Sequence, residues 1–79
     1  MELEILTPRG KEFEGQAEVL VLPTLLGQIS VLPEHASLIS VLKAGKMQIK
    51  TKGKDISKEI EGGILEVSQN KAVILLKKF

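Results

Sequence analysis

Apolar residues recur at every second position in two separate parts of the chain. Leu3 and Ile5 alternate with glutamates, and Met47 and Ile49 alternate with lysine and glutamine. Successive side chains of a β-strand point to opposite faces of its sheet, so this period places all apolar side chains of a segment on one face. Both segments are therefore predicted to be half-buried antiparallel strands whose lysines face solvent.

Two other segments, residues 17–22 and 72–76, are almost continuously apolar and rich in valine, isoleucine and leucine. We expect them to be central strands that are covered on both faces. The segment that holds Ile56 and Ile60 is ambiguous, because these residues share a face of a strand and are also four positions apart, as on a helix. Flanking glycines leave only about eight residues, a length that favours a hairpin strand.

Turn-forming residues separate these runs at intervals of about ten residues, the spacing that is typical of small all-β folds. The predicted turns contain Pro8-Arg9-Gly10, Glu14-Gly15, Pro23-Thr24, Gly27, Pro33-Glu34, Ala44-Gly45, Lys52-Gly53-Lys54, Gly62-Gly63 and Gln69-Asn70. The pattern predicts an all-β fold, a small antiparallel β-sandwich of about eight to ten short strands. We expect one domain that spans residues 1–79.

Size and composition limit how this fold is stabilised and what it binds. The chain has 79 residues, no cysteine and one histidine, which excludes disulfides, thiolate metal sites and histidine-rich zinc sites. Domains this small have marginal cores, so a partner protein or self-association is the expected source of further stability.

The charges are balanced, with 11 Lys and Arg against 10 Asp and Glu, and the only aromatic residues are Phe13 and Phe79. Nucleic-acid binding needs a basic stripe or stacking platforms, so we expect no nucleic-acid partner. No apolar run approaches the ~20 residues that span a bilayer, and the N-terminus lacks a signal-peptide pattern. A soluble cytosolic chain is expected, which reaches a membrane only through another protein.

His35 is the only candidate acid–base residue. Glu34 and Asp55 are acidic candidates for its neighbours, and serines are near in sequence, but no G-x-S-x-G pattern marks a nucleophile. We therefore interpret His35 as a turn or interface residue. Paired carboxylates such as Glu12 and Glu14 are interpreted as a solvated sheet face.

Two glycine-containing segments have a structural interpretation as well as a functional one. Gly62-Gly63 precedes strand residues instead of a helix, so it indicates a bulge or a close approach between strands and not a phosphate site. Leu25-Leu26 stands between Pro23-Thr24 and Gly27, which predicts a loop tip. Two interpretations remain open: the leucines are exposed at this tip and contact a partner, or they pack inward against the core.

A series of short motifs runs along the chain, and its most specific part is V-L-P-x-H-A followed by G-G-x-L-x-V. The motif residues are Thr7-Pro8-x-Gly10, Phe13-x-Gly15, Val21-Leu22-Pro23, Gly27, Val31-Leu32-Pro33-x-His35-Ala36-x-Leu38, Leu42, Gly45, Gly62-Gly63-x-Leu65-x-Val67 and Asn70. This series resembles the N-terminal β-sandwich domain of the epsilon subunit of F-type ATP synthase, and the resemblance covers nearly the whole chain.

The resemblance implies a non-catalytic central-stalk subunit that docks the gamma subunit to the membrane c-ring and couples rotation to ATP synthesis. It implies no cofactor and no catalytic or metal site, and a location at the cytoplasmic face of the bacterial plasma membrane or its organelle equivalent. It assigns the c-ring contact to Leu25, Leu26, Gly27 and Gln28. It assigns the gamma contact to Pro33, His35 and Ala36.

The chain departs from this family in three places. Family members commonly carry glutamate at the position of Gln28, and a small polar loop at Leu25-Leu26. Epsilon subunits typically continue into a C-terminal helical hairpin, whereas this sequence ends at Lys77-Lys78-Phe79. It is therefore either a short form or an excised domain, and neither hairpin inhibition nor an ATP site is expected of it. The alternative function is a stand-alone β-sandwich module for protein–protein interaction through a sheet edge or loop.

Overall fold

The computed structural model describes residues 1–79 and consists of nine strands without a helix. The all-β prediction and the expected number of short strands are confirmed, and the ambiguous segment around Ile56 is a hairpin strand, as expected. The strands are β1 (Glu2–Thr7), β2 (Gly10–Gln16), β3 (Val19–Thr24), β4 (Gly27–Val31), β5 (Leu38–Leu42), β6 (Gly45–Thr51), β7 (Lys54–Ile60), β8 (Gly63–Ser68) and β9 (Lys71–Leu76).

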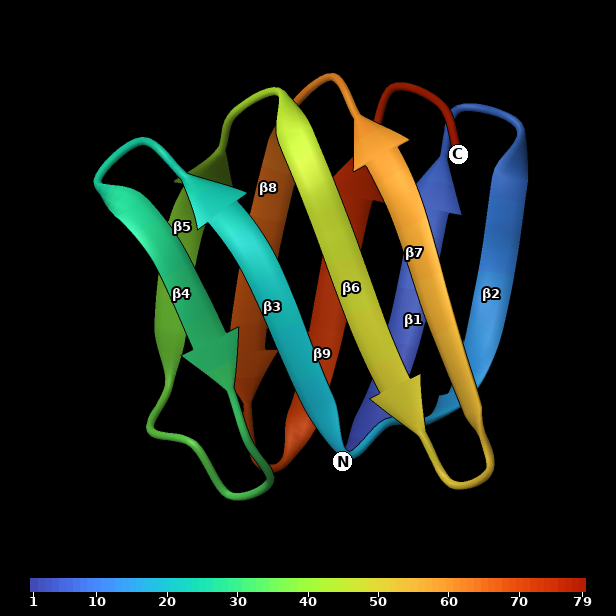
Figure 1. Ribbon diagram of the computed structural model, residues 1–79, viewed down its shortest axis with the longest axis vertical. Coiled ribbons are helices and arrows are strands. Elements are labelled where there is room, and N and C mark those ends of the chain that lie inside the picture. The colour runs from blue at the N-terminus through green and yellow to red at the C-terminus, as the bar shows by residue number, and fades with distance from the viewer.

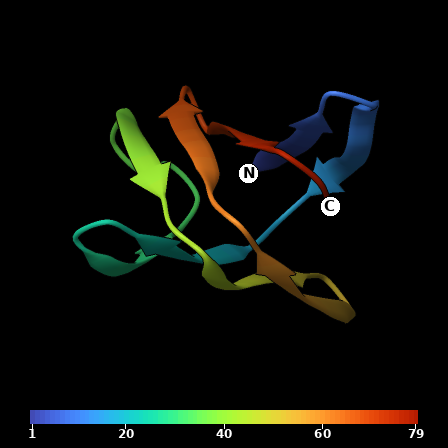
Figure 2. The ribbon, with the colours of Figure 1, turned by 90° about the horizontal axis from the view of Figure 1, so that it is seen from above.

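These strands form two layers that face each other (Figure 1). One layer has the order β2-β1-β9-β8-β5, and the other has the order β4-β3-β6-β7. The view from above separates the two layers (Figure 2), which are joined through one pairing between Thr24 and Leu42. The sandwich prediction is confirmed.

One pair of strands departs from the antiparallel arrangement. β1 and β9 are parallel, with Leu3 opposite Ala72 and Ile5 opposite Ile74, whereas all other paired strands are antiparallel. Apolar and polar residues alternate in the same way in parallel and in antiparallel strands, so the alternation could not predict that β1 and β9 are parallel. The pairing attaches the first strand to the last one and fixes both within the larger layer.

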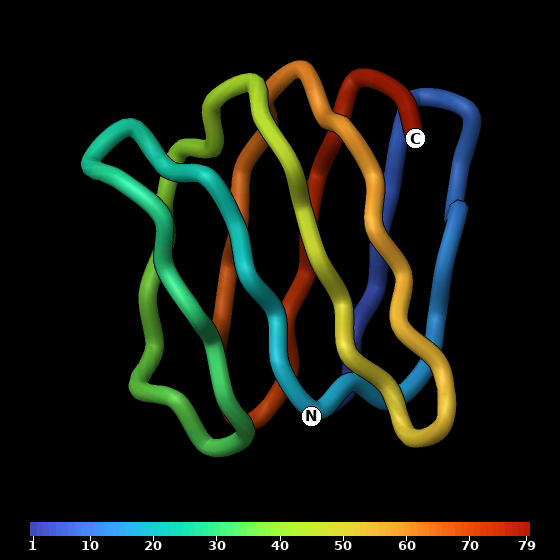
Figure 3. Tube along the Cα trace, viewed as in Figure 1, coloured from blue at the N-terminus to red at the C-terminus, as the bar shows by residue number.

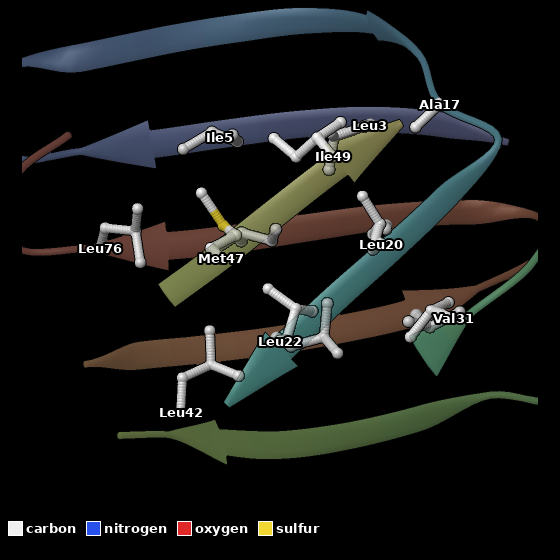
Figure 4. Packing of buried hydrophobic residues seen from close by; sticks show 14 of the residues in the cluster. Leu3, Ile5, Ala17, Leu20, Leu22, Val31, Leu42, Met47, Ile49 and Leu76 are labelled. Carbon is white, nitrogen blue, oxygen red and sulfur yellow. The ribbon is translucent and has the colours of Figure 1, made fainter. Parts of the chain in front are cut away.

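The core lies between the layers and is aliphatic. It consists of 16 buried residues, and Figure 4 shows side chains from both layers meeting there. Leu20, Leu22 and Ile49 are fully buried. Burial of each such side chain stabilises the fold by about 1.5–3 kcal/mol relative to exposure. The alternating positions of β1 and β6 point inward as predicted.

The expectation that residues 17–22 and 72–76 are covered on both faces is wrong. β3 and β9 are central strands, but Val21 and Val73 are only half-buried, and Leu75 is 44% exposed. A sandwich has only two layers, so each strand has one inner face and one outer face. Their outward apolar residues are therefore left on the surface.

Two of the predicted turns are also wrong. Glu14-Gly15 lies within β2, where Gly15 is opposite Leu3, and Pro23-Thr24 forms the end of β3. Pro23 is opposite Gln28 in the ladder with β4. Proline is tolerated at a ladder position that needs no N–H donor, which is why the strand continues through it.

The predicted close approach at Gly63 is confirmed. A Cβ atom at this position would overlap the backbone carbonyl oxygen of Leu75 and would lie 2.8 Å from Cδ2 of Leu76. Gly63 is paired with both Leu42 and Leu76, at the start of the central strand β8. Position 63 therefore requires glycine, because β9 leaves no room for a side chain there.

The trace in Figure 3 places the connections at two ends of the sandwich. The β3–β4 turn and the C-terminus lie at the upper end in this view. The N-terminus and the connection from β4 to β5 lie at the lower end. The sequence-predicted contact residues are divided between these two ends.

Candidate interaction site

The two groups of predicted contact residues lie at opposite ends of β4. We call Leu25, Leu26, Gly27 and Gln28 the leucine turn, and Pro33, His35 and Ala36 the histidine corner. Five residues form β4, and at about 3.4 Å per residue this strand separates the groups by about 17 Å. The structure therefore does not bring them together into one site.

The side chains of the leucine turn point away from the protein. Leu26 is 100% exposed and Leu25 is 65% exposed, so the inward packing that the sequence left open does not occur. Buried Thr24 shapes the turn, because its Oγ1 donates a hydrogen bond to the Gly27 carbonyl and accepts one from the Leu26 N–H at 3.2 Å. These bonds fix the backbone that presents the two leucines.

Backbone hydrogen bonds also attach this turn to the opposite layer. The Leu25 N–H donates to the Val41 carbonyl at 3.2 Å, and the Lys43 N–H donates to the Pro23 carbonyl at 3.0 Å. A turn that is already ordered loses little conformational entropy when a partner binds it. The leucine turn is therefore well prepared as a contact surface.

The histidine corner is a polar, exposed turn. The His35 N–H donates to the Leu32 carbonyl at 3.2 Å, and the ring Nδ1–H donates to the Ala36 carbonyl at 2.7 Å. Pro33, His35 and Ala36 are all exposed. These contacts are those of a turn residue, one of the two roles expected for His35.

One side chain from a distant part of the sequence holds the histidine corner. Asn70, in the β8–β9 turn, accepts a hydrogen bond at its Oδ1 from the Glu34 N–H, at 2.7 Å. Glu34 and Asn70 both have positive φ angles, 64° and 59°. Asparagine tolerates this conformation better than most residues and supplies the acceptor as well.

Replacing Asn70 by alanine is expected to lower the free energy of unfolding by about 1 kcal/mol, through loss of this hydrogen bond and strain at positive φ. Hydrogen exchange at the Glu34 amide should accelerate. Asn70→Asp keeps an acceptor oxygen and tolerates positive φ, so it should resemble the wild type. Equal exchange at Glu34 in both variants would contradict the role assigned to Asn70.

The ionisable groups form solvated pairs rather than a reactive cluster. Lys11 Nζ lies 3.2 Å from Glu4 and 3.3 Å from Glu14, and these hydrogen bonds raise the pKa of Lys11 above its ordinary value. The third ion pair joins Lys78 to Glu61, so none includes His35. The surface has no pocket, no cluster of potential metal ligands was found, and no helix has the length and hydropathy of a membrane span.

Sequence reasoning missed an aliphatic row on the outer face of the larger layer. Val41 is opposite Ile64, and Ile64 is opposite Leu75. These three side chains are 44–51% exposed, and Ile39 on β5 is 74% exposed. The apolar runs in β5 and β9 carried the signal, because a two-layer fold must expose every second residue of such a run.

The fold and its exposed turns define a small two-layer β-sandwich with apolar side chains presented to solvent. The family model described as "ATP synthase, Delta/Epsilon chain, beta-sandwich domain" matches residues 1–79. The chain belongs to this family, as the motifs indicated.

Similar proteins support the same assignment. The chain is 42% identical over 73 residues to an ATP synthase epsilon chain of Pelotomaculum thermopropionicum, covering 92% of this chain and 54% of that relative. It is 46% identical over 77 residues to the ATP synthase epsilon chain of Campylobacter curvus, covering 95% and 59%. The chain thus spans little more than half the length of these relatives.

Two solved structures share the fold. A chain in the Euglena gracilis mitochondrial ATP synthase, determined with OSCP, F1 and the c-ring, superposes with a TM-score of 0.89 at 19% identity, covering 96% of this chain and 49% of that one. A chain in the central stalk and c-ring of the Tetrahymena thermophila enzyme gives a TM-score of 0.83 at 18% identity, covering 96% and 62%. At these identities the likeness concerns the fold.

Proposed function

We propose that this chain is the β-sandwich domain, residues 1–79, of a central-stalk subunit of an F-type ATP synthase. In this role it docks the gamma subunit to the c-ring, takes no part in catalysis and couples rotation to ATP synthesis. The family match over the whole chain carries the proposal. It is supported by relatives named as ATP synthase epsilon chains.

The leucine turn is proposed as the contact with the c-ring. Its exposed leucines stand on a turn that is held by the Thr24 hydroxyl and by the backbone hydrogen bond from Leu25 to Val41 of the other layer. Gln28, where the family commonly has glutamate, is exposed and uncharged. The contact in this protein is therefore proposed to depend on burial of leucine side chains and on neutral hydrogen bonds, with no ion pair.

The histidine corner is proposed as the contact with the gamma subunit. Its residues are exposed and fixed by hydrogen bonds to Leu32, Ala36 and Asn70. A subunit that transmits torque needs two contact surfaces on a stiff body, and the two turns lie at opposite ends of a strand that pairs with the central strand β3. The proposed location is the cytoplasmic face of the bacterial plasma membrane, with the membrane reached only through the c-ring.

Co-expression with the gamma subunit of the same organism tests the proposal. The affinity-tagged chain should retain gamma at equal stoichiometry, and the purified chain should not hydrolyse ATP. Ala36→Glu should weaken the complex at least about tenfold, since it places a carboxylate in the contact. Ser57→Glu on β7 is the matched control and should bind normally. Absence of gamma from the wild-type eluate would contradict the proposed function.

The second candidate function is a stand-alone interaction module that binds through a sheet edge. It is favoured by the exposed edge of β4, whose residues Gln28 and Ser30 face solvent. Such a module should retain its affinity after Gln28→Ala and His35→Ala. A stalk subunit should lose affinity for gamma with the second substitution.

A further inference from the structure

The edge strand β4 lacks the features that prevent edge strands from pairing with other chains. From Val19 to Pro33 the sequence contains no charged residue, although 27% of the chain is charged. The ladder between β3 and β4 has no register shift, whereas the β1–β2 ladder has one. Charged side chains and bulges are common means of blocking an edge. The β2 and β7 edges carry lysines and glutamates. The uncharged edge of β5 meets the end of β3 and the β3–β4 turn, through Thr24 opposite Leu42 and the Leu25 N–H on the Val41 carbonyl. β4 is therefore the edge that has neither charge nor a neighbouring strand.

The free backbone groups of β4 belong to alternate residues. Thr24 and Gly27 close the two-residue turn, and the next pair joins Pro23 to Gln28. Pro23 has no N–H, so this pair cannot exchange two hydrogen bonds, and by alternation neither does the pair of Val21 with Ser30. The N–H and C=O groups of Gln28 and Ser30 therefore point away from β3, toward the open edge.

We propose that this edge pairs with the same edge of a second copy of the chain, in antiparallel orientation about a two-fold axis at Ile29. This register places Gln28 of each copy opposite Ser30 of the other. All the groups brought together are the outward-pointing ones, so about four backbone hydrogen bonds form. The two β4-containing layers then become one continuous sheet across the dimer.

Side chains next to the strand fit the same axis. Leu26 and Leu32 flank β4, each three positions from Ile29, and they are 100% and 54% exposed. The two-fold register brings Leu26 of each copy toward Leu32 of the other, so exposed apolar surface is buried twice. A charged residue close to a two-fold axis lies close to the same residue of the second copy, and the two like charges repel. The absence of charge from Val19 to Pro33 removes that repulsion.

Self-pairing covers part of the leucine turn, namely Leu26 and Gln28. If the proposed stalk function holds, the dimer and the ring-bound subunit are mutually exclusive, and the dimer is a form of the free chain. The dimer itself does not depend on that function. Its assay uses the isolated chain, so its failure is distinct from a failure to bind gamma.

Sedimentation equilibrium of the purified chain tests the proposal over concentrations from about 1 μM to 1 mM, the range in which weak specific complexes dissociate. A monomer–dimer equilibrium is expected. On raising the concentration, hydrogen exchange at the Gln28 and Ser30 amides should slow. A chain that stays monomeric throughout, or amides that exchange equally at both limits, would overturn it.

The decisive variant is Ser30→Pro. It removes one outward N–H without breaking the β3–β4 ladder, and it should raise the dimer dissociation constant at least about tenfold. Ser57→Pro is the matched control on β7. Thr51 and Lys54 close that hairpin, so alternation leaves the Ser57 N–H unpaired as well. Circular dichroism verifies that both variants fold. Equal dimer affinity of Ser30→Pro and the wild type would overturn the proposal.

Discussion

Gly63→Ala is expected to destabilise the domain by about 3 kcal/mol, because backbone atoms would have to move apart to admit one methyl group. The atom in the way is the Leu75 carbonyl oxygen, which belongs to the neighbouring strand β9 and cannot rotate aside as a side chain would. Small domains without disulfides have a net stability of about 3–5 kcal/mol. A substantial unfolded population is therefore expected at room temperature.

Urea unfolding followed by far-UV circular dichroism measures this effect, since the chain has no tryptophan or tyrosine for fluorescence. Gly15→Ala is the matched control, because its Cβ would lie at an ordinary 3.4 Å from Cζ of Phe13, and Gly15 has no positive φ. That variant should stay within about 0.5 kcal/mol of the wild type. A Gly63→Ala midpoint equal to that of the wild type would mean that β8 and β9 are not packed as closely as described.

The local pattern of the sequence predicted the strands better than their arrangement. The inward positions of Leu3, Ile5, Met47 and Ile49 follow directly from the period of two, and all four are buried. The parallel pairing of β1 with β9 depends instead on contacts between the two ends of the chain. No local pattern encodes such contacts. The parallel pairing of β1 with β9 is visible only in the complete sheet.

The sequence indicated the leucines of the candidate contact but not the free edge beside them. Leu25 and Leu26 stand out as apolar residues beside turn formers, although their exposure could be settled only by the structure. The free edge of β4 was not visible in the sequence, because any strand is an edge or a central strand depending on its neighbours. Pro23 illustrates the same dependence: it reads as a turn signal, yet it occupies a ladder position that needs no donor.

The double substitution Leu25→Ser and Leu26→Glu is expected to weaken association with the c-ring at least about a hundredfold while leaving the fold unchanged. Both side chains are mainly solvent-exposed in the free chain, so the free energy of unfolding should change by no more than about 0.5 kcal/mol. In the proposed contact each leucine would contribute about 1.5 kcal/mol through burial. Their loss corresponds to at least a hundredfold weaker binding, by about 1.4 kcal/mol per factor of ten. Binding of the variant to a gamma–c-ring subcomplex, with urea unfolding in parallel, measures both effects.

Salt dependence separates an apolar contact at this turn from an ionic one. Exposed ion pairs weaken as salt screens them, whereas burial of leucine does not depend on that screening. The leucine turn has no charge, so wild-type binding to the ring should change little between about 0.05 and 0.5 M salt. Gln28→Glu restores the residue common in the family and should make binding salt-dependent if basic groups face it on the ring. Normal binding by the Leu25→Ser, Leu26→Glu variant would place the ring contact elsewhere on the sandwich.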